Sequence, residues 1–143
     1  MRNYDTNVLA LAGGVGGAKL ALGLSKVLSP EQLTVVVNTG DDEVFYGLNV
    51  SPDLDTVMYT LAGISNPETG WGIAGETFNM LERLSAYGED TWFGLGDKDV
   101  ATHIRRTNLL RNGDTLSQVT SKLAAALGVG CGIVPMTDDS LRT

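Results

Sequence analysis

The hydrophobic positions of this sequence alternate between short apolar runs and stretches with helical spacing. Residues 7–12 contain the apolar run VLALA before a group of glycines, and residues 33–37, LTVVV, form a continuous run rich in β-branched side chains. Continuous runs of this kind are typical of parallel strands buried on both faces. Residues 19–28 carry leucines and a valine at helical spacing. The beginning of the sequence therefore predicts a strand, a glycine loop, a helix and a second strand.

The rest of the sequence continues this alternation. Helices are predicted over SPDLDTVMYTLAG, over residues 77–87, over residues 98–112, and after a cap at Asp114 or Thr115. The segments DTWFGLGD and GCGIVPM predict short strands, and NTGDDEVFYGLN predicts a loop rich in glycine and acids.

Alternating strands and helices predict an α/β fold: a three-layer, Rossmann-like, doubly wound and mostly parallel sheet. The length suits one domain, residues 1–143. The last predicted strand ends close to the final residue, so we expect a sheet without its later strands. Ligands of such folds bind beyond the carboxyl ends of the strands, and each glycine- and acid-rich cluster falls at such an end.

Composition narrows the classes of function. The formal charge of −7 argues against a nucleic-acid or anionic-membrane surface, so any phosphate must be held locally. No apolar run is long enough for a membrane span. The single cysteine, Cys131, has no partner for an internal disulfide and is expected to be a small buried hydrophobe, which favours the cytoplasm.

The stretch GGVGGAK, residues 13–19, is the first candidate site. Glycines between a strand and a helix let backbone N–H groups and the helix dipole face a phosphate. Lys19 stands where a dinucleotide fingerprint needs a small residue, and Leu20 follows it where a Walker motif needs Ser or Thr. A lysine in the first helical turn opposes the helix dipole, which favours an anionic ligand nearby. The alternative is that these glycines, Gly13, Gly14, Gly16 and Gly17, only permit close packing of the strand and the helix.

Four aspartates gather at one predicted edge of the sheet. Asp41 and Asp42 follow the second strand, while Asp53 and Asp55 lie at the start of the next helix. Carboxylates together with substrate phosphates suit Mg²⁺, so we expect at least one of the four to bind metal or substrate. The alternative is that Asp53 and Asp55 only complement the dipole of the helix and that Asp41 and Asp42 only form a turn.

For the remaining candidate site residues, the sequence does not decide between a functional and a structural role. His103, the sole histidine, has a capping or packing role as readily as a functional one. Arg105 and Arg106 are more often a solvated helix face than a phosphate contact. Trp71 and Trp92 lie beside glycine loops, where stacking on a planar ligand and core packing are equal alternatives.

Seven stretches together resemble the 2-phospholactate transferase family (CofD/FbiA) of coenzyme F420 biosynthesis. They are LAGGVGGAKLALGL, VVNTGDD, SPDLDTVMYTLAG, GWGIAGET, WFGLGDKDVATHIRRT, LSQVT and IVPMTDD. The resemblance implies a magnesium-dependent phosphotransferase. Such an enzyme joins a phospholactyl-type group from a guanosine diphosphate conjugate to the deazaflavin alcohol FO, giving F420-0 or a dehydro form and releasing GMP.

The resemblance also implies roles for individual residues. The loop from Gly13 to Lys19 and the segment containing Met136, Asp138 and Asp139 would hold the guanosine diphosphate part. Asp41 would ligate Mg²⁺, with Asp42 nearby. Asp55 and the backbone at Gly94 would lie at the deazaflavin site, where Asp55 would accept the hydroxyl proton or only position the hydroxyl.

Family members are roughly twice this long, so the chain resembles their N-terminal half, the nucleotide- and deazaflavin-binding part. The motifs are nearer to bacterial members, for which an enolpyruvyl donor is conceivable, but they do not settle the acyl group. The alternative function is a nucleotide-binding module or regulator without turnover. A half-domain with an exposed apolar sheet is also expected to self-associate as a homo-oligomer or to aggregate.

Overall fold

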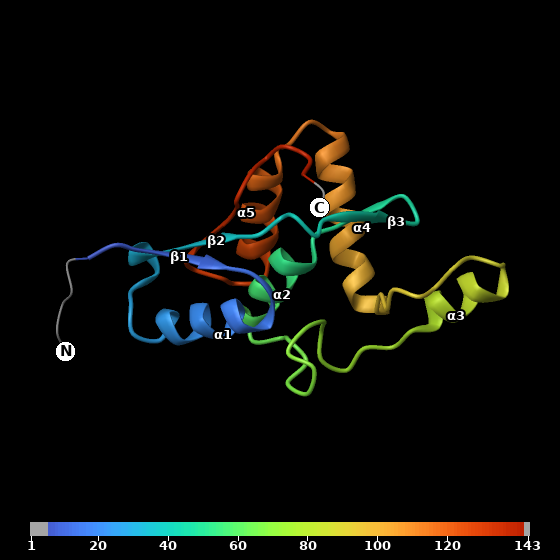
Figure 1. The fold of residues 1–143 in the computed structure, drawn as a ribbon, viewed down its shortest axis with the longest axis horizontal. Helices are drawn as coiled ribbons and strands as arrows, with labels where there is room; N and C mark the ends of the chain where they lie inside the picture. The colour runs from blue at the N-terminus through green and yellow to red at the C-terminus, as the bar shows by residue number, and fades with distance from the viewer. Residues whose placement is uncertain (1–5, 142–143) are drawn as a thin grey trace.

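A computed structural model describes residues 6–141, and Figure 1 shows their arrangement. The fold is α/β, with a parallel three-stranded sheet in the order β1-β2-β5 and a separate antiparallel hairpin, β3-β4. The strands are β1 (Val8–Ala12), β2 (Leu33–Val37), β3 (Glu43–Phe45), β4 (Leu48–Val50) and β5 (Gly132–Pro135). The predicted α/β class with a parallel sheet is confirmed. The predicted domain, 1–143, includes residues 1–5 and 142–143, which lie outside the described residues.

The helices follow the predicted order along the chain. They are α1 (Gly14–Ser25), α2 (Pro52–Leu61), α3 (Asn79–Ala86), α4 (Asp97–Arg111) and α5 (Leu116–Ala126), with a short 3-10 helix, η1, at Pro30–Gln32. Thr115 caps α5 as expected, because its hydroxyl accepts a hydrogen bond from the backbone N–H of Gln118. No helix within residues 6–141 is both long and apolar enough to cross a membrane.

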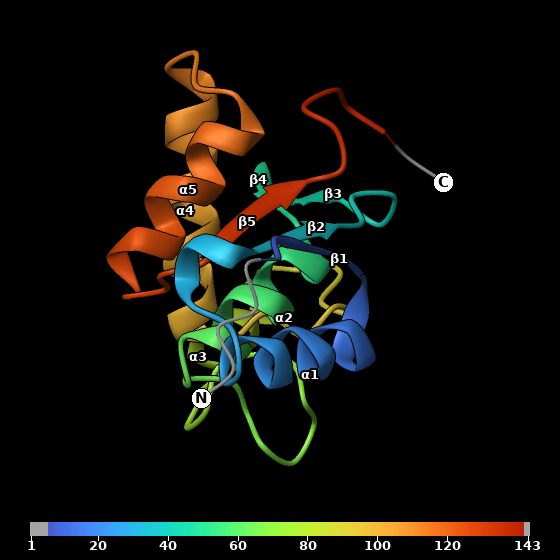
Figure 2. The same cartoon turned by 90° about the vertical axis from the view of Figure 1, so that its left-hand side faces the viewer.

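The main core lies between the sheet and the pair α1 and α2, which lie side by side in both views (Figures 1 and 2). Alternate residues of β2, from Leu33 to Val37, are buried there, and small side chains at Ala18 and Ala21 let α1 approach the sheet closely. On the other face of the sheet, Leu9 and Leu11 of β1 are 64% and 74% exposed. Helices α4 and α5 pack on each other, and α5 packs beside β5 (Figure 2).

Two predictions about the loops are wrong. The segment NTGDDEVFYGLN contains the β3-β4 hairpin, whose turn places Tyr46 and Gly47 at positive φ angles of 53° and 77°. The segment DTWFGLGD is not a strand, because Phe93 instead stacks on Phe45 of the hairpin, with ring centroids 4.4 Å apart. Aromatic packing between the two segments therefore replaces the expected strand pairing.

The start of the first helix also differs from the prediction. Helix α1 begins at Gly14, inside the glycine loop, rather than after it. Lys19 therefore lies in the second turn and not in the first. It is exposed, and no ion pair joins it to another residue within 6–141. Its charge therefore opposes the helix dipole only weakly, because the dipole acts mainly within the first turn.

Two acidic side chains tie the segment 62–78 to α4. The Glu76 carboxylate accepts the backbone N–H of Lys98, which satisfies a donor at the start of α4. In return the Asp97 carboxylate accepts hydrogen bonds from the Thr77 hydroxyl, at 2.6 Å, and from the backbone N–H of Met80, at 3.0 Å. A side chain at Gly96 would overlap the Glu76 carboxylate. These reciprocal caps fix the segment that contains Trp71.

Candidate functional site

The predicted site segments converge at the carboxyl ends of the three parallel strands. Asn38 N–H, just after β2, donates to the Ala12 carbonyl at 3.0 Å, and Met136 N–H, just after β5, donates to the Val37 carbonyl at 2.8 Å. The glycine loop, the Asp41–Asp42 pair and the segment with Asp138 and Asp139 therefore leave the sheet along one edge. This is the edge at which ligands bind in open α/β sheets.

The four loop glycines differ in what surrounds them. Gly13 is the N-cap residue of α1, so no side chain caps the first amides, and the first turn carries no acid. Gly14 has a φ of +61°, a conformation that favours glycine. A Cβ on Gly17 would lie 2.9 Å from Ala12, whereas a Cβ on Gly16 would meet open space. Close packing therefore explains Gly17, and the uncapped amides beside Gly13 and Gly14 remain open to a ligand.

Asn38 connects two of the predicted aspartates. Its side-chain amide donates to Asp41 Oδ2 at 3.2 Å and to Asp53 Oδ2 at 2.9 Å. Asp53 Oδ2 also lies 3.3 Å from the place that a Cβ on Gly13 would take. An anion at the glycine loop would thus meet a carboxylate at close range, and a cation between them would relieve the repulsion.

Asp42 faces a different cavity, which we call the acidic pocket. It has a volume of about 210 Å³ and is lined by residues that include Asp42, Ser51, Asp138 and Asp139. Ser51 donates to Asp42 Oδ2 at 2.7 Å, while Asp42 Oδ1 and the Thr39 hydroxyl are buried without a hydrogen-bond partner within residues 6–141. Burial raises the pKa of Asp42 to about 6, against the opposing effect of the Ser51 hydrogen bond.

The segment after β5 reaches the same cavity. Asp138 Oδ1 accepts the backbone N–H of Ser117 at the start of α5, at 2.7 Å, and the Asp139 N–H donates to the Thr137 hydroxyl at 3.1 Å. Met136 is 44% exposed at the sheet edge. The PMTDD segment is therefore held beside Asp42 through Asp138 and Asp139.

A second cavity, the aromatic pocket, lies next to the acidic pocket, and both are lined by Val50. The aromatic pocket has a volume of about 280 Å³. Its aromatic walls are Tyr59, Trp71 and Phe93. Its other lining residues include Gly14, Asp53, Asp55, Gly94, Asp99 and His103. The pocket thus joins the first residue of α1 to predicted residues of the deazaflavin site.

A buried ionic cluster forms one side of the aromatic pocket. Both oxygens of Asp55 accept hydrogen bonds from the Arg106 guanidinium, one of them from Nη1 to Oδ2 at 3.2 Å. Arg106 Nη1 also lies 3.1 Å from His103 Nδ1. Burial alone would lower the pKa of Arg106, but the Asp55 carboxylate raises it above its usual value. Asp55 and Arg106 therefore form a buried ion pair, with His103 bonded to the arginine.

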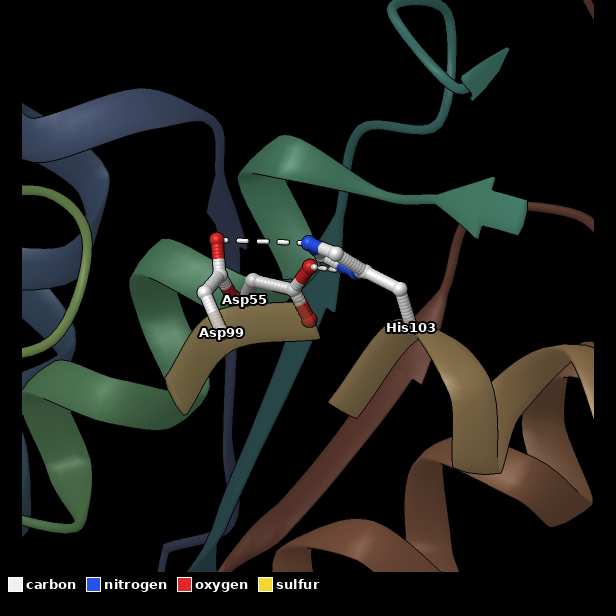
Figure 3. A group of neighbouring side chains, drawn as sticks. All are labelled: Asp55, Asp99 and His103. Carbon is white, nitrogen blue, oxygen red and sulfur yellow. Dashed lines mark ion pairs between the residues drawn. The ribbon is translucent and has the colours of Figure 1, made fainter. Parts of the chain in front are cut away.

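Asp99 completes this cluster on the pocket side (Figure 3). His103 Nε2 lies 3.2 Å from Asp99 Oδ2, and the Tyr59 hydroxyl donates to Asp99 Oδ1 at 2.6 Å. Burial would raise the pKa of Asp99, but His103, Tyr59 and Arg106 together lower it below its ordinary value. The Asp99 carboxylate is thus held in its ionised form at the wall of the pocket.

Asp55, Asp99 and His103 also form a group able to hold a metal ion, since their ligand atoms lie within 4.8 Å of one another. The Arg106 guanidinium already supplies the positive charge there, because it bonds both Asp55 and His103. The acidic pocket fits a cation better. Asp42 Oδ1 is a buried carboxylate oxygen without a donor, an arrangement that a divalent ion would satisfy.

Several sequence-based alternatives are resolved here. Arg105 is exposed as expected, but the interpretation of Arg106 as a solvated residue is wrong, because its side chain is 1% exposed. His103 is buried and lines the pocket. Trp71 is 51% exposed over the aromatic pocket, and Trp92 is 73% exposed, so neither is a core residue. Cys131 is only partly buried, at the edge of the main core.

Sequence reasoning missed three polar residues of the site: Asn38, Tyr59 and Asp99. A usable signal existed for Asp99, because Asp99, His103 and Arg106 follow one another at spacings of four and three and so share one helix face. Ile104, on the same helix, is 46% exposed. The buried face of α4 runs through His103 and Arg106.

A family model described as "2-phospho-L-lactate transferase CofD" matches residues 8–143. A phosphoenolpyruvate transferase of Streptomyces avermitilis is 51% identical over 137 residues, which is 95% of this chain and 43% of the relative. Proteins of the same name from Thermobifida fusca and Mycolicibacterium smegmatis are 50% and 45% identical, each over 95% of this chain and 45% of their own length. The chain thus spans less than half the length of these relatives.

Proposed function

We propose a function from one premise: this chain belongs to the CofD family of 2-phospho-L-lactate transferases. The proposal is that it forms the N-terminal, nucleotide- and deazaflavin-binding part of a phosphotransferase of coenzyme F420 biosynthesis. The protein would transfer a phospholactyl or phosphoenolpyruvyl group from its guanosine diphosphate conjugate to FO, giving F420-0 or dehydro-F420-0 and GMP. The observation that carries the proposal is the aromatic pocket, which extends from Gly14 at the start of α1 to the carboxylates of Asp55 and Asp99.

The nucleotide diphosphate would lie at the carboxyl ends of the strands. The uncapped amides after Gly13 would face its phosphates, with Gly14 and Gly16 keeping the approach free of side chains and Gly17 letting the helix pack closely against β1. Met136, Asp138 and Asp139 would contact the guanosine part. Lys19 would act as a solvated cation at longer range, since it lies in the second turn of α1.

Mg²⁺ is the proposed cofactor, with Asp41 and Asp42 as its protein ligands. The unpartnered, buried Asp42 Oδ1 supports this, as does the carboxylate of Asp53 beside Gly13, which would otherwise repel a diphosphate. A bound Mg²⁺ neutralises phosphate charge during phosphoryl transfer. The side chains of Asp41 and Asp42 bond different partners, Asn38 and Ser51, so ligation by both would require one of them to turn.

FO would occupy the aromatic pocket. Its planar ring suits walls formed by Tyr59, Trp71 and Phe93, and the backbone at Gly94 lets the ring approach without a side chain in the way. Asp55 would position this end of the site through Arg106, because both of its oxygens are engaged by the guanidinium. The reaction needs no covalent enzyme nucleophile, only alignment of the hydroxyl with the phosphorus and neutralisation of charge.

The donor and the cellular setting follow from the relatives and from charge. The matched relatives are named phosphoenolpyruvate transferases, which favours an enolpyruvyl donor over a lactyl one. The net charge of −7 supports small-molecule partners rather than nucleic acid or an anionic membrane, and the single cysteine favours a cytoplasmic location. The exposed leucines of β1 support self-association as a homo-oligomer.

A nucleotide-binding regulator without turnover is the second candidate, and the observation in its favour is the glycine loop, whose uncapped amides would bind a nucleotide diphosphate without any acceptor alcohol. Calorimetric titration with GDP and with FO, each with and without Mg²⁺, separates the two. The transferase proposal expects both ligands to bind and expects Mg²⁺ to strengthen GDP binding in the wild type more than in Asp42→Asn. GDP binding with no response to FO would favour the regulator and contradict the transferase proposal. Asp114→Asn, which changes a surface carboxylate, is the matched control.

A further inference from the structure

One carboxylate of the aromatic pocket has no assigned role in this reaction. Asp99 lies in the first turn of α4, and its side chain is 15% exposed, about twice the 7% of Asp55. It lines the aromatic pocket and also a neighbouring cavity beneath Trp71. Asp99 is therefore the member of the buried cluster that a ligand in the pocket reaches most easily.

The hydrogen bonds of the cluster determine the state of His103. Arginine only donates hydrogen bonds, so His103 Nδ1, 3.1 Å from Arg106 Nη1, must accept. The ring proton is then on Nε2, which has no well-formed hydrogen bond within residues 6–141 and lies 3.2 Å from Asp99 Oδ2. A small rotation of Asp99 would complete that bond. Figure 3 shows Asp99 and His103 turned toward each other in this way.

The charges of the cluster do not balance. Asp55 and Asp99 contribute two negative charges, Arg106 contributes one positive charge, and His103 is neutral when it accepts from Arg106. Both oxygens of Asp55 accept hydrogen bonds from the Arg106 guanidinium, so these two charges neutralise each other. The remaining negative charge therefore belongs to Asp99, whose Oδ1 accepts from the neutral Tyr59 hydroxyl and whose Oδ2 lies 3.2 Å from Nε2 of the neutral His103 ring.

We propose that Asp99 accepts the hydrogen bond, and then the proton, of the alcohol that reacts in the aromatic pocket, with Tyr59 and His103 as the residues that position its carboxylate. This inference rests on the proposed transferase function. The hydroxyl oxygen forms a bond to the donor phosphorus as the bond from that phosphorus to the GMP oxygen breaks. GMP leaves with that oxygen and the bonding electron pair, and the hydroxyl proton moves to Asp99.

The test is a double-mutant cycle in binding, read by the fluorescence of the deazaflavin. Wild type and Asp99→Asn are each titrated with FO and with an FO analogue that lacks the reacting ribityl hydroxyl. Loss of a hydrogen bond to a charged group is expected to weaken FO binding about tenfold or more, and analogue binding less than about threefold. Asp114→Asn, a surface carboxylate outside the site, should bind both ligands as the wild type does.

Turnover gives the second measurement. Removal of a general base is expected to lower kcat about 10²- to 10⁴-fold. If Asp99→Asn does not fold, as judged by circular dichroism, Asp99→Ser takes its place in both measurements.

The outcomes distinguish this inference from the function on which it rests. Equal effects on FO and the analogue, or an unchanged kcat, would overturn the role of Asp99 and leave the transferase function standing. A wild-type protein that binds no FO would overturn both. A hydroxyl-dependent loss of FO affinity in a protein without turnover would support the contact and count against the transfer step.

Discussion

Replacing Asp55 by asparagine tests the buried ion pair between Asp55 and Arg106. The side chains of Asp55 and Arg106 are 7% and 1% exposed, and the Asp55 carboxylate meets the guanidinium with both oxygens. Asparagine has nearly the same shape but no charge. The substitution therefore leaves the buried Arg106 guanidinium without the carboxylate that accepts its hydrogen bonds, since Asp99, the other carboxylate of the cluster, is bonded by Tyr59 and lies beside His103.

The expected loss is large because a buried guanidinium that loses its hydrogen-bonded carboxylate keeps most of its desolvation cost. Removing one partner of such a pair costs about 3–5 kcal/mol of unfolding free energy, out of a total of about 5–15 kcal/mol for a typical domain. An exposed pair costs about 0–1 kcal/mol. Lys122 and Asp114 provide that comparison, since their charged atoms are 2.5 Å apart and their side chains are 53% and 24% exposed.

Urea unfolding followed by circular dichroism measures both effects. With a slope of about 2 kcal/mol/M, Asp55→Asn should lower the midpoint by about 1.5–2.5 M and Lys122→Gln by less than about 0.5 M. The double variant Asp55→Leu/Arg106→Met removes both charges and should be more stable than Asp55→Asn alone. A midpoint shift for Asp55→Asn no larger than that of Lys122→Gln, at an unchanged slope, would refute the reasoning.

Three further changes test other parts of the structure. Gly17→Ala should lower the free energy of unfolding by about 1–3 kcal/mol because its methyl group would meet the preceding strand. Gly16→Ala, with open space, should be neutral or stabilising, so equal losses in thermal unfolding would count against this packing. Hydrogen bonds, first that of Thr77, lower the pKa of Asp97 from 3.8 to about 2. The ionised carboxylate therefore stabilises the folded protein fully above a pH of about 4, and this stabilisation is lost as the pH falls toward about 2. The Tm difference between wild type and Asp97→Asn should therefore close as the pH falls from about 4 to 2, and a constant difference would contradict this. Mg²⁺ at about 100 times its Kd should stabilise the wild type by about 2.7 kcal/mol and Asp42→Asn by clearly less, whereas equal shifts in thermal denaturation would exclude Asp42 as a ligand.

The fold was predictable where one local signal dominates. The run LTVVV is β2 to the residue, Thr115 caps α5, and the sheet edge collects the glycine- and acid-rich loops as expected. The hairpin was missed because its strands are three residues each, too short for alternation to show. The start of α1 was misplaced because the low helix propensity of glycine hid a helix that packing stabilises.

The site was predictable as a set of positions but not as a set of interactions. Asp41, Asp53 and Asp55 lie at the predicted edge, yet the sequence contains no sign that Asn38 would bridge the first two. Arg106 was interpreted as solvated because arginine is rarely buried unless it is paired. Its partner lies 51 residues earlier in the chain, and only the tertiary structure shows that contact.

The proposed transfer reaction is tested by measuring GMP release from the guanosine diphosphate conjugate of enolpyruvate in the presence of the purified protein. We expect GMP to appear only when FO and Mg²⁺ are both present, together with one equivalent of phosphoenolpyruvylated FO. GMP release that does not depend on FO, or binding of both ligands with no transfer, would contradict it.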